Sequence, residues 1–200
     1  MDIEILDTRS TRLNIWKIED ENVYQVIDLS KYLSDTQISK IWLHRQVIID
    51  IHEYATKSLE QKPVREVGGF FLGNYKKNHA NYGISIDQFV PSTPKHNSPV
   101  EFVFGAKATI ELENVLNKIE NKNKVCIGWF HTHPGHTPYL SNMDMTPHEG
   151  LFKEAFQIAV VLDSLTVDFD TGFFTRKQNG QVNNHIDFDK WIGWKNLNFL

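Results

Sequence analysis

Apolar and polar residues alternate along the chain in short blocks that predict several strands. Strands at residues 13–18 and 23–29, separated by the acidic turn at 19–22, predict an N-terminal hairpin. Two continuous apolar runs, at 125–130 and 157–162, are typical of strands that are buried on both faces. The other strands are expected at residues 66–73 and 84–90, with a last hairpin over 166–176 that turns at 170–172.

Apolar residues with a period of 3.6 predict two longer helices, over 44–59 and 106–120. Their buried faces are expected to consist of Val47, Ile48, Ile51, Ala55 and Leu59 in the first helix, and of Ile110, Leu112, Val115, Leu116 and Ile119 in the second. A third, short helix is expected to open at Thr146, with Pro147 in its first position and Glu149 completing a capping box.

The proline-rich residues 91–99 are expected to form a loop between the strand at 84–90 and the second helix. No repeat and no low-complexity tract interrupts this order of elements. Strands interleaved with helices over 200 residues predict a single mixed α/β domain.

Composition narrows the function classes. The chain has 21 Lys and Arg against 25 Asp and Glu, a net charge of −4, which argues against nonspecific binding to nucleic acid or anionic membranes. The acidic N-terminus and the absence of a long apolar run predict a cytoplasmic protein with no secretory signal and no membrane span. Cys126 is the only cysteine, so no internal disulfide is expected.

The segment between the two buried strands holds the candidate chemistry. His131 and His133 stand two residues apart at the end of a strand, so both side chains are expected to point to the same side. Two neutral imidazoles that face one point form half of a tetrahedral zinc site. The chain then turns at Pro134 and Gly135 and leads to Asp144, whose carboxylate is a candidate third ligand.

Three protein ligands leave a fourth position for water, the arrangement of metal sites that carry out chemistry. Two imidazoles and one carboxylate suit zinc better than Mg²⁺ or Ca²⁺, and iron(II) accepts the same set. Glu66 is the best upstream candidate for a general base, because it lies beside the Gly68–Gly69 pair at a strand start. Ser141 is a candidate donor to the oxyanion of a tetrahedral intermediate.

Together these residues resemble the signature of the JAMM (MPN-domain) metalloproteases. The family pattern is an upstream Glu, then His-x-His-Pro, seven residues between the second His and a Ser, and x-x-Asp. In this chain the pattern reads Glu66, His131–Thr132–His133–Pro134, the spacer 134–140, Ser141 and Asp144. The flanking segments Glu66–Val67–Gly68–Gly69 and Gly128–Trp129–Phe130 resemble the family as well, and the resemblance covers about residues 40–176.

The resemblance implies a single MPN domain with a curved mixed β-sheet flanked by helices, similar to the cytidine deaminase fold. It implies His131, His133 and Asp144 as ligands of one Zn²⁺ per chain. It also implies Glu66 as the general base that carries a proton from the attacking water to the leaving amine, and Ser141 as the oxyanion stabiliser. Members of the family hydrolyse the bond after the C-terminal Gly-Gly of ubiquitin or a ubiquitin-like protein, which makes such a protein or its conjugates the implied partner.

The leading hypothesis is therefore a zinc isopeptidase or peptidase that processes a ubiquitin-like precursor or removes the modifier from its targets. The form His-Thr-His-Pro-Gly resembles stand-alone bacterial members that accompany ubiquitin-like conjugation systems, some of them linked to antiphage defence. The alternatives are a non-catalytic MPN scaffold subunit, a peptidase that processes a sulfur-carrier protein, and a zinc hydrolase like those associated with DNA repair. All five motif positions are present and the net charge is negative, which favours the first hypothesis.

The MPN domain is expected at residues 37–182, between an N-terminal extension at 1–36 that forms a hairpin and a C-terminal tail at 183–200. In the tail, Trp191 and Trp194 are expected to pack against the domain, with a partner anchor as the alternative. No pattern in the chain sets an oligomeric state.

Three further residues near the motif have competing interpretations. Cys126 is expected to be a small packed side chain that faces away from the metal, and the alternative is an inhibitory ligand. His136 is expected to be solvated, with substrate contact as the alternative. His148 is expected on the surface near a helix start, although its closeness to Asp144 leaves room for a supporting role.

Overall fold

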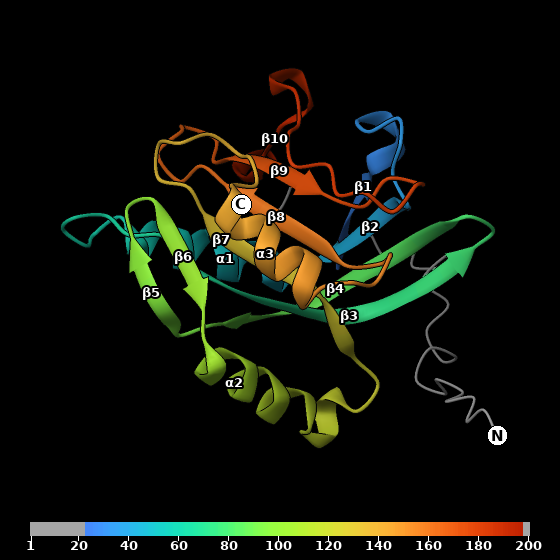
Figure 1. The fold of residues 1–200 in the computed structure, drawn as a ribbon, viewed down its shortest axis with the longest axis horizontal. Coiled ribbons are helices and arrows are strands. Elements are labelled where there is room, and N and C mark those ends of the chain that lie inside the picture. The colour runs from blue at the N-terminus through green and yellow to red at the C-terminus, as the bar shows by residue number, and fades with distance from the viewer. Residues whose placement is uncertain (1–22, 198–200) are drawn as a thin grey trace.

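The computed structural model describes residues 23–197, and one mixed sheet runs through the molecule (Figure 1). Within this range the eight strands of the sheet lie in the order β1 (Tyr24–Asp28), β2 (Ile38–His44), β4 (Asn81–Pro91), β3 (Gly68–Asn78), β7 (Val125–Thr132), β8 (Ile158–Leu162), β9 (Asp170–Phe174) and β10 (Ile192–Gly193). The sheet is mixed because β2 runs parallel to β4 and β7 runs parallel to β8, whereas the other neighbours are antiparallel. The expected α/β class is confirmed.

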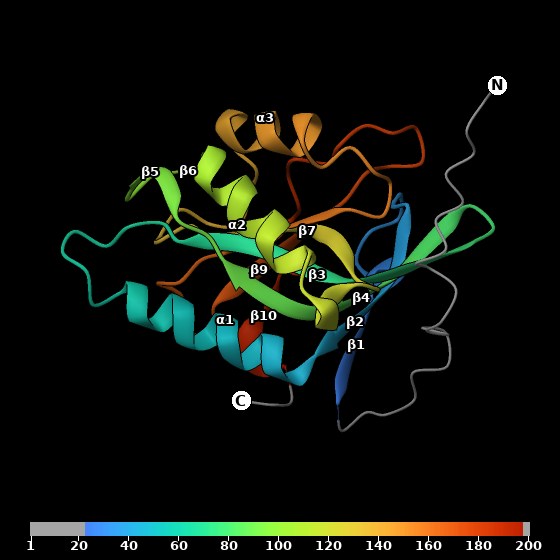
Figure 2. The ribbon, with the colours of Figure 1, turned by 90° about the horizontal axis from the view of Figure 1, so that it is seen from below.

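Helices cover both faces of the sheet (Figure 2). α1 (Arg45–Ser58) packs on one face, while α2 (Ala106–Leu116) and α3 (Asn142–Gly150) lie on the other. Short 3-10 turns are found at Leu29–Lys31, Ile119–Asn121, Phe188–Lys190 and Trp194–Asn196. No helix within residues 23–197 is long and apolar enough to cross a membrane.

The first predicted helix is confirmed as α1, and its apolar face lies in the core as the periodicity requires. Its buried positions are Val47, Ile48, Ile51, Ala55 and Ser58. Leu59, expected at the end of the same face, is half-buried because the helix ends one residue earlier. This face joins the core that includes the central residues of β2, β4 and β8.

Gly68 and Gly69 open β3 at a point where both neighbouring strands approach it closely. A Cβ atom on Gly68 would lie 2.4 Å from the carbonyl oxygen of Phe130 in β7. A Cβ atom on Gly69 would lie 2.2 Å from the carbonyl oxygen of Val90 in β4. Only glycine admits both approaches, so the pair lets β3 enter between β4 and β7 and brings the preceding Glu66 to the end of β7.

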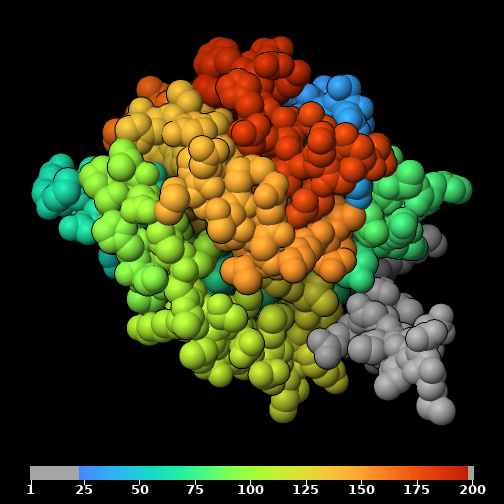
Figure 3. Space-filling view, viewed as in Figure 1, coloured from blue at the N-terminus to red at the C-terminus, as the bar shows by residue number. Residues whose placement is uncertain are grey.

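The expectation of a loop over residues 91–99 is wrong. Its second half forms β5 (Pro94–Ser98), which pairs with β6 (Glu101–Phe104) in a separate two-stranded hairpin. Pro94 takes the first strand position, where a missing N–H is tolerated. The Phe104 ring stacks on Phe70 of β3 at 4.8 Å, which anchors the hairpin to the sheet. The hairpin lies beside α3 on the face seen in Figure 3.

α2 is shorter than the predicted helix over 106–120, and its buried face differs. The backbone N–H of Asn117 closes the helix, and the buried Asn121 side chain donates to the carbonyl of Val115 at 2.9 Å. Ile110 and Ile119, both expected in the core, are exposed, at 56% and 83%. Because α2 ends at Leu116, Ile119 lies in the following 3-10 turn and not on the buried face of the helix.

One predicted helix start and one predicted turn lie elsewhere in the structure. α3 begins after Ser141, not at Thr146, because the capping box forms between Ser141 and Asp144, and Pro147 lies inside the helix. The turn expected at 170–172 is wrong because these residues belong to β9. The true turn lies between β8 and β9, where the Thr166 hydroxyl bonds the backbone of Asp163 and Asp170.

Strands near both ends of the described chain join the sheet. β1 pairs with β2, while its predicted partner at residues 13–18 lies outside the described residues. In the tail, β10 pairs with β9, and the fully buried Trp194 donates through Nε1 to the carbonyl of Ile48 in α1 at 3.0 Å. Trp194 therefore packs into the domain as expected, and the division at 37–182 stays a prediction.

Candidate metal centre

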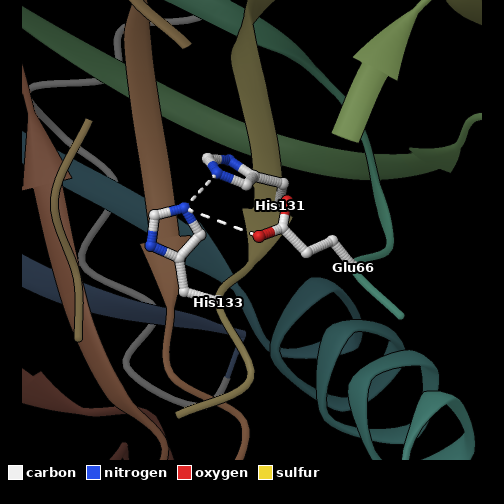
Figure 4. A group of neighbouring side chains, drawn as sticks. All are labelled: Glu66, His131 and His133. Carbon is white, nitrogen blue, oxygen red and sulfur yellow. Dashed lines mark hydrogen bonds and ion pairs between the residues drawn. The ribbon is translucent and has the colours of Figure 1, made fainter. Parts of the chain in front are cut away.

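Glu66 is brought to the two histidines by the pairing of β3 with β7. His131 lies in β7, opposite Gly68 of β3, and His133 follows directly after the strand. Between them, Thr132 accepts the Val67 N–H at its hydroxyl and donates its own N–H to the Val67 carbonyl, at 3.0 and 2.9 Å. These two bonds fix Val67, the residue after Glu66, against Thr132. The side chains of Glu66, His131 and His133 therefore converge (Figure 4).

The polar atoms of Glu66, His131, His133 and Asp144 lie close together. The Nε2 atoms of His131 and His133 are 2.9 Å apart, and Glu66 Oε1 lies 4.0 Å from the Nε2 atom of His133. One ligand atom from each of these three buried residues lies within 4.8 Å of the others, so the group could hold a metal ion. Asp144 lies on the same side, with Oδ1 3.3 Å from Nε2 of His131 and Oδ2 3.7 Å from Nε2 of His133.

Ser141 and Asp144 reach the site through the cap of α3. Ser141 donates its hydroxyl to Asp144 Oδ2 at 2.6 Å and its backbone N–H to the same oxygen at 2.8 Å. In return, the Asp144 N–H donates to the Ser141 hydroxyl at 3.3 Å, which completes the capping box. Two bonds occupy Oδ2, so Oδ1 is the Asp144 oxygen that is turned toward His131.

Charge and burial shift the pKa values in opposite directions within the group. Burial raises the pKa of Glu66 to about 8, against the lowering effect of His133. Burial alone would also raise the pKa of Asp144, but the charge and hydrogen bond of His131 hold it well below its usual range. Burial lowers the pKa of His131. Burial also opposes the charged form of His133, but the nearby Asp144 and Glu66 carboxylates outweigh it and raise the pKa of His133. A carboxyl group that is proton-bearing near neutrality thus faces one that is ionised.

Aromatic rings support both histidines. The Trp129 indole stacks on His131 at 5.0 Å, and the Tyr139 ring meets His133 edge-on at 4.9 Å. His148, expected on the surface, is fully buried instead, and its Nδ1 accepts the Trp129 indole N–H at 3.1 Å. The prediction of a surface position for His148 was wrong because α3 starts earlier than predicted, which turns the His148 side chain toward the sheet.

A narrow cavity of about 50 Å³ opens onto the site. It is lined by Glu66, Val100, Glu101, Phe102, His133, His136, Tyr139, Ser141, Met143 and Asp144. A larger apolar groove of about 430 Å³ continues from it between β6 and α3, with Phe102 and Met143 in both linings. The hairpin residues in these linings were missed by the sequence analysis because a proline-rich segment gave no strand signal.

The two remaining candidate residues, His136 and Cys126, have different surroundings. His136 is exposed and lines the cavity wall. Cys126 packs with the second hydrophobic core, its thiol points toward the carbonyl of Gly128 at 3.5 Å, and burial raises its pKa to about 12. A protonated thiol in an apolar setting agrees with the expected packing role.

The donor set fits a zinc ion. Two imidazole nitrogens and two carboxylates face one point in a pocket from which water is largely excluded. Neutral imidazole and carboxylate are ligands that zinc accepts at four-coordinate sites. Without a cation, the imidazole Nε2 atoms and the carboxylate oxygens on the inner side of this group would face only one another, which is a costly arrangement.

One of the comparisons with known proteins identifies the family of this chain. No curated protein matches the chain in sequence. Among solved structures, the solution structure of protein DSY2949 from Desulfitobacterium hafniense is 17% identical, covers 72% of this chain and 88% of its own, and has a TM-score of 0.47. The model of the family described as JAB1/Mov34/MPN/PAD-1 ubiquitin protease matches residues 36–155. The chain therefore belongs to the JAB1/Mov34/MPN/PAD-1 family and folds as a single JAB/MPN domain.

Proposed function

We propose that this chain is a zinc-dependent isopeptidase or peptidase that hydrolyses the bond after the C-terminal glycine of a ubiquitin-like protein. The observation that carries the proposal is the convergence of two histidine Nε2 atoms, 2.9 Å apart, with the carboxylates of Asp144 and Glu66 in one buried pocket. Family membership supports the same chemistry, because the family description names a ubiquitin protease.

His131, His133 and Asp144 would hold the zinc ion. When bound, zinc acts as a Lewis acid that polarises a carbonyl and makes water nucleophilic near neutral pH. Asp144 is the better ligand of the two carboxylates, because its oxygens lie 3.3 and 3.7 Å from the imidazole nitrogens while Glu66 lies 4.0 Å away.

Glu66 would act as the general base and then as the general acid. Its carboxyl group is buried, and the positive charge of a bound zinc ion would lower the pKa of about 8 that burial gives it, so the carboxylate could take a proton from the attacking water and give it to the leaving amine at neutral pH. In this reaction, water would add to the carbonyl carbon and give one proton to Glu66. The C–N bond would then break, and the amine would leave with that proton from Glu66.

Ser141 would donate its hydroxyl to the oxygen of the tetrahedral intermediate. In the present geometry that hydroxyl is bonded to Asp144 Oδ2, so it must turn by rotation about its own side-chain bond during the reaction. The backbone N–H of Ser141 keeps Asp144 in place meanwhile, since it binds the same oxygen at 2.8 Å.

The surroundings of the site fit an extended peptide that ends in glycine. The cavity at the site is narrow, about 50 Å³, which favours residues without side chains next to the scissile bond. The adjoining groove of about 430 Å³ is apolar and would receive the preceding residues of the modifier's tail between Phe102 and Met143. A ubiquitin-like protein or its conjugate is the partner that this shape favours.

The experiment is cleavage of a panel of ubiquitin-like fusion proteins by the purified chain, with product masses measured and zinc counted by elemental analysis. We expect about one zinc per chain and cleavage after a terminal glycine. Glu66→Gln should keep zinc and lose turnover, His131→Ala should lose both, and the exposed Glu60→Gln should lose neither. Zinc binding without cleavage of any fusion would favour a scaffold, and absence of zinc would exclude the proposed mechanism.

A further inference from the structure

Asp163 ties the metal-ligand loop to the end of β8. Its carboxylate is buried, with the residue 3% exposed, and accepts three backbone N–H groups. Oδ1 accepts from Gly135 at 2.8 Å and from Leu165 at 3.0 Å, and Oδ2 accepts from Thr137 at 3.1 Å. One side chain therefore fixes two points of the loop that follows His133, from a position 28 residues farther along the chain.

That loop in turn fixes the ring of His133. The Nδ1 atom of His133 lies 2.9 Å from the carbonyl oxygen of Thr137, which can only accept a hydrogen bond. Nδ1 must therefore carry the hydrogen, and Nε2 keeps the lone pair that faces His131 and Asp144. A metal ligand needs this tautomer and this ring orientation.

The Thr137 carbonyl depends on Asp163 for its direction. Thr137 has φ of +61° and Gly135 has φ of +81°, so the loop passes twice through the left-handed region, which is unfavourable for threonine. The bonds from both residues to the Asp163 carboxylate offset that cost. Without them, the backbone at Thr137 would relax and its carbonyl would turn away from His133.

We infer that Asp163 is a positioning residue for the metal ligand His133, acting through the Thr137 peptide. It sets the protonated nitrogen and the orientation of the imidazole and never touches the metal or the substrate. The inference rests on the proposed function only in assuming that His133 binds a metal ion.

The test measures Co²⁺ and Zn²⁺ affinity and the visible absorption spectrum of the Co²⁺-loaded protein. Asp163→Asn has the same shape but replaces one acceptor oxygen with a donor, so one of the backbone N–H groups loses its partner. We expect the wild-type chain to bind both ions and the Asp163→Asn chain to bind them about 10- to 100-fold more weakly, with an altered Co²⁺ spectrum. Asp168→Asn, an exposed residue in the same β8–β9 loop, should match the wild type in both.

A second measurement does not depend on the variant folding. In the metal-free wild-type chain, nitrogen-15 chemical shifts of the His133 ring should report hydrogen on Nδ1, and a ring with hydrogen on Nε2 but none on Nδ1 would overturn the inference. Equal affinities and identical Co²⁺ spectra for the wild type and Asp163→Asn would also overturn it. Failure of the wild type to bind either ion would overturn the proposed metal centre instead, so the two failures are distinguishable.

Discussion

The indole nitrogen of Trp129 donates a hydrogen bond to Nδ1 of His148 at 3.1 Å, and both side chains are buried. The same indole stacks on His131 on its other side, with an angle of 16° between the rings. His148 therefore helps to fix the Trp129 ring, which in turn stacks on the candidate metal ligand His131. Because its Nδ1 accepts, His148 must be neutral to keep the bond.

Stability is expected to fall in acid because of His148. Burial and the charge of Arg176 lower its pKa to about 4, whereas an unfolded chain has the ordinary value near 6.5. Between these values the unfolded state binds the extra proton at this position, so the contribution of His148 to the free energy of unfolding should decrease by about 3 kcal/mol as the pH falls from 6.5 to 4. Urea unfolding of the metal-free wild type and of His148→Phe at several pH values measures this contribution as the difference between the two slopes.

His148→Phe should remove this contribution, because no proton is taken up at that position on unfolding. His185→Gln, at an exposed position, should leave the slope unchanged. Equal slopes for the wild type and His148→Phe would show that His148 is not buried in its neutral form.

Ser141→Ala separates the two roles of the serine hydroxyl. Loss of the cap should lower the free energy of unfolding by about 1 kcal/mol. Zinc content should be preserved, because the backbone N–H of Ser141 still binds Asp144 Oδ2, while kcat should fall on the order of 100-fold as an oxyanion donor is lost. Unfolding curves, elemental analysis and steady-state kinetics test these expectations, and loss of zinc would assign the hydroxyl to ligand support instead.

Gly128→Ala should disrupt the contact between β7 and β8. A Cβ atom at this position would lie 1.9 Å from the carbonyl oxygen of Ile158, its partner in the parallel pair, so the strands would have to separate. We expect a loss of about 3 kcal/mol in the free energy of unfolding, measured by urea titration.

Gly150→Ala is the matched control, because no atom lies within 4 Å of its added Cβ. Its position in α3 favours a gain of up to about 1 kcal/mol. Similar losses for the two glycine variants would contradict the proposed origin of the Gly128 effect.

Trp194→Ala tests how firmly the C-terminal segment belongs to the domain. Its side chain is fully buried and its indole N–H reaches the α1 backbone, so truncation should cost about 3–5 kcal/mol of unfolding free energy. Trp191→Ala, at a half-buried position with a bond only to Ile186 in its own segment, should cost clearly less. Equal and small effects in urea titrations would mean that the tail does not stabilise the domain.

The sequence allows the central elements to be predicted because their signals are local. The 3.6-residue period of α1 and the apolar runs of β7 and β8 coincide with burial in the structure. The spacing of His131 and His133 is likewise a local property of one strand end.

Other features depend on contacts between distant residues and carry no such signal. The β5–β6 hairpin includes the second half of a proline-rich segment and is held by an aromatic contact to β3. Both Ser141 and Thr146 are suitable residues for the N-cap of α3, and their local sequence does not show that Ser141 is the one that caps the helix. Asp163 was missed because it lies 26 residues from Thr137, and nothing in its own segment marks it as a partner of the ligand loop.

The parallel pairing of β7 with β8 and of β2 with β4 has a consequence for folding. Parallel neighbours need long crossover connections, and chains rich in such non-local contacts fold slowly. The candidate centre draws Glu66, His133 and Asp144 from segments that meet only when β3, β7 and α3 are all in place. A metal ion that binds there would select the native chain over every partly folded form, so its uptake should be among the last events of folding and should shift the folding equilibrium by mass action.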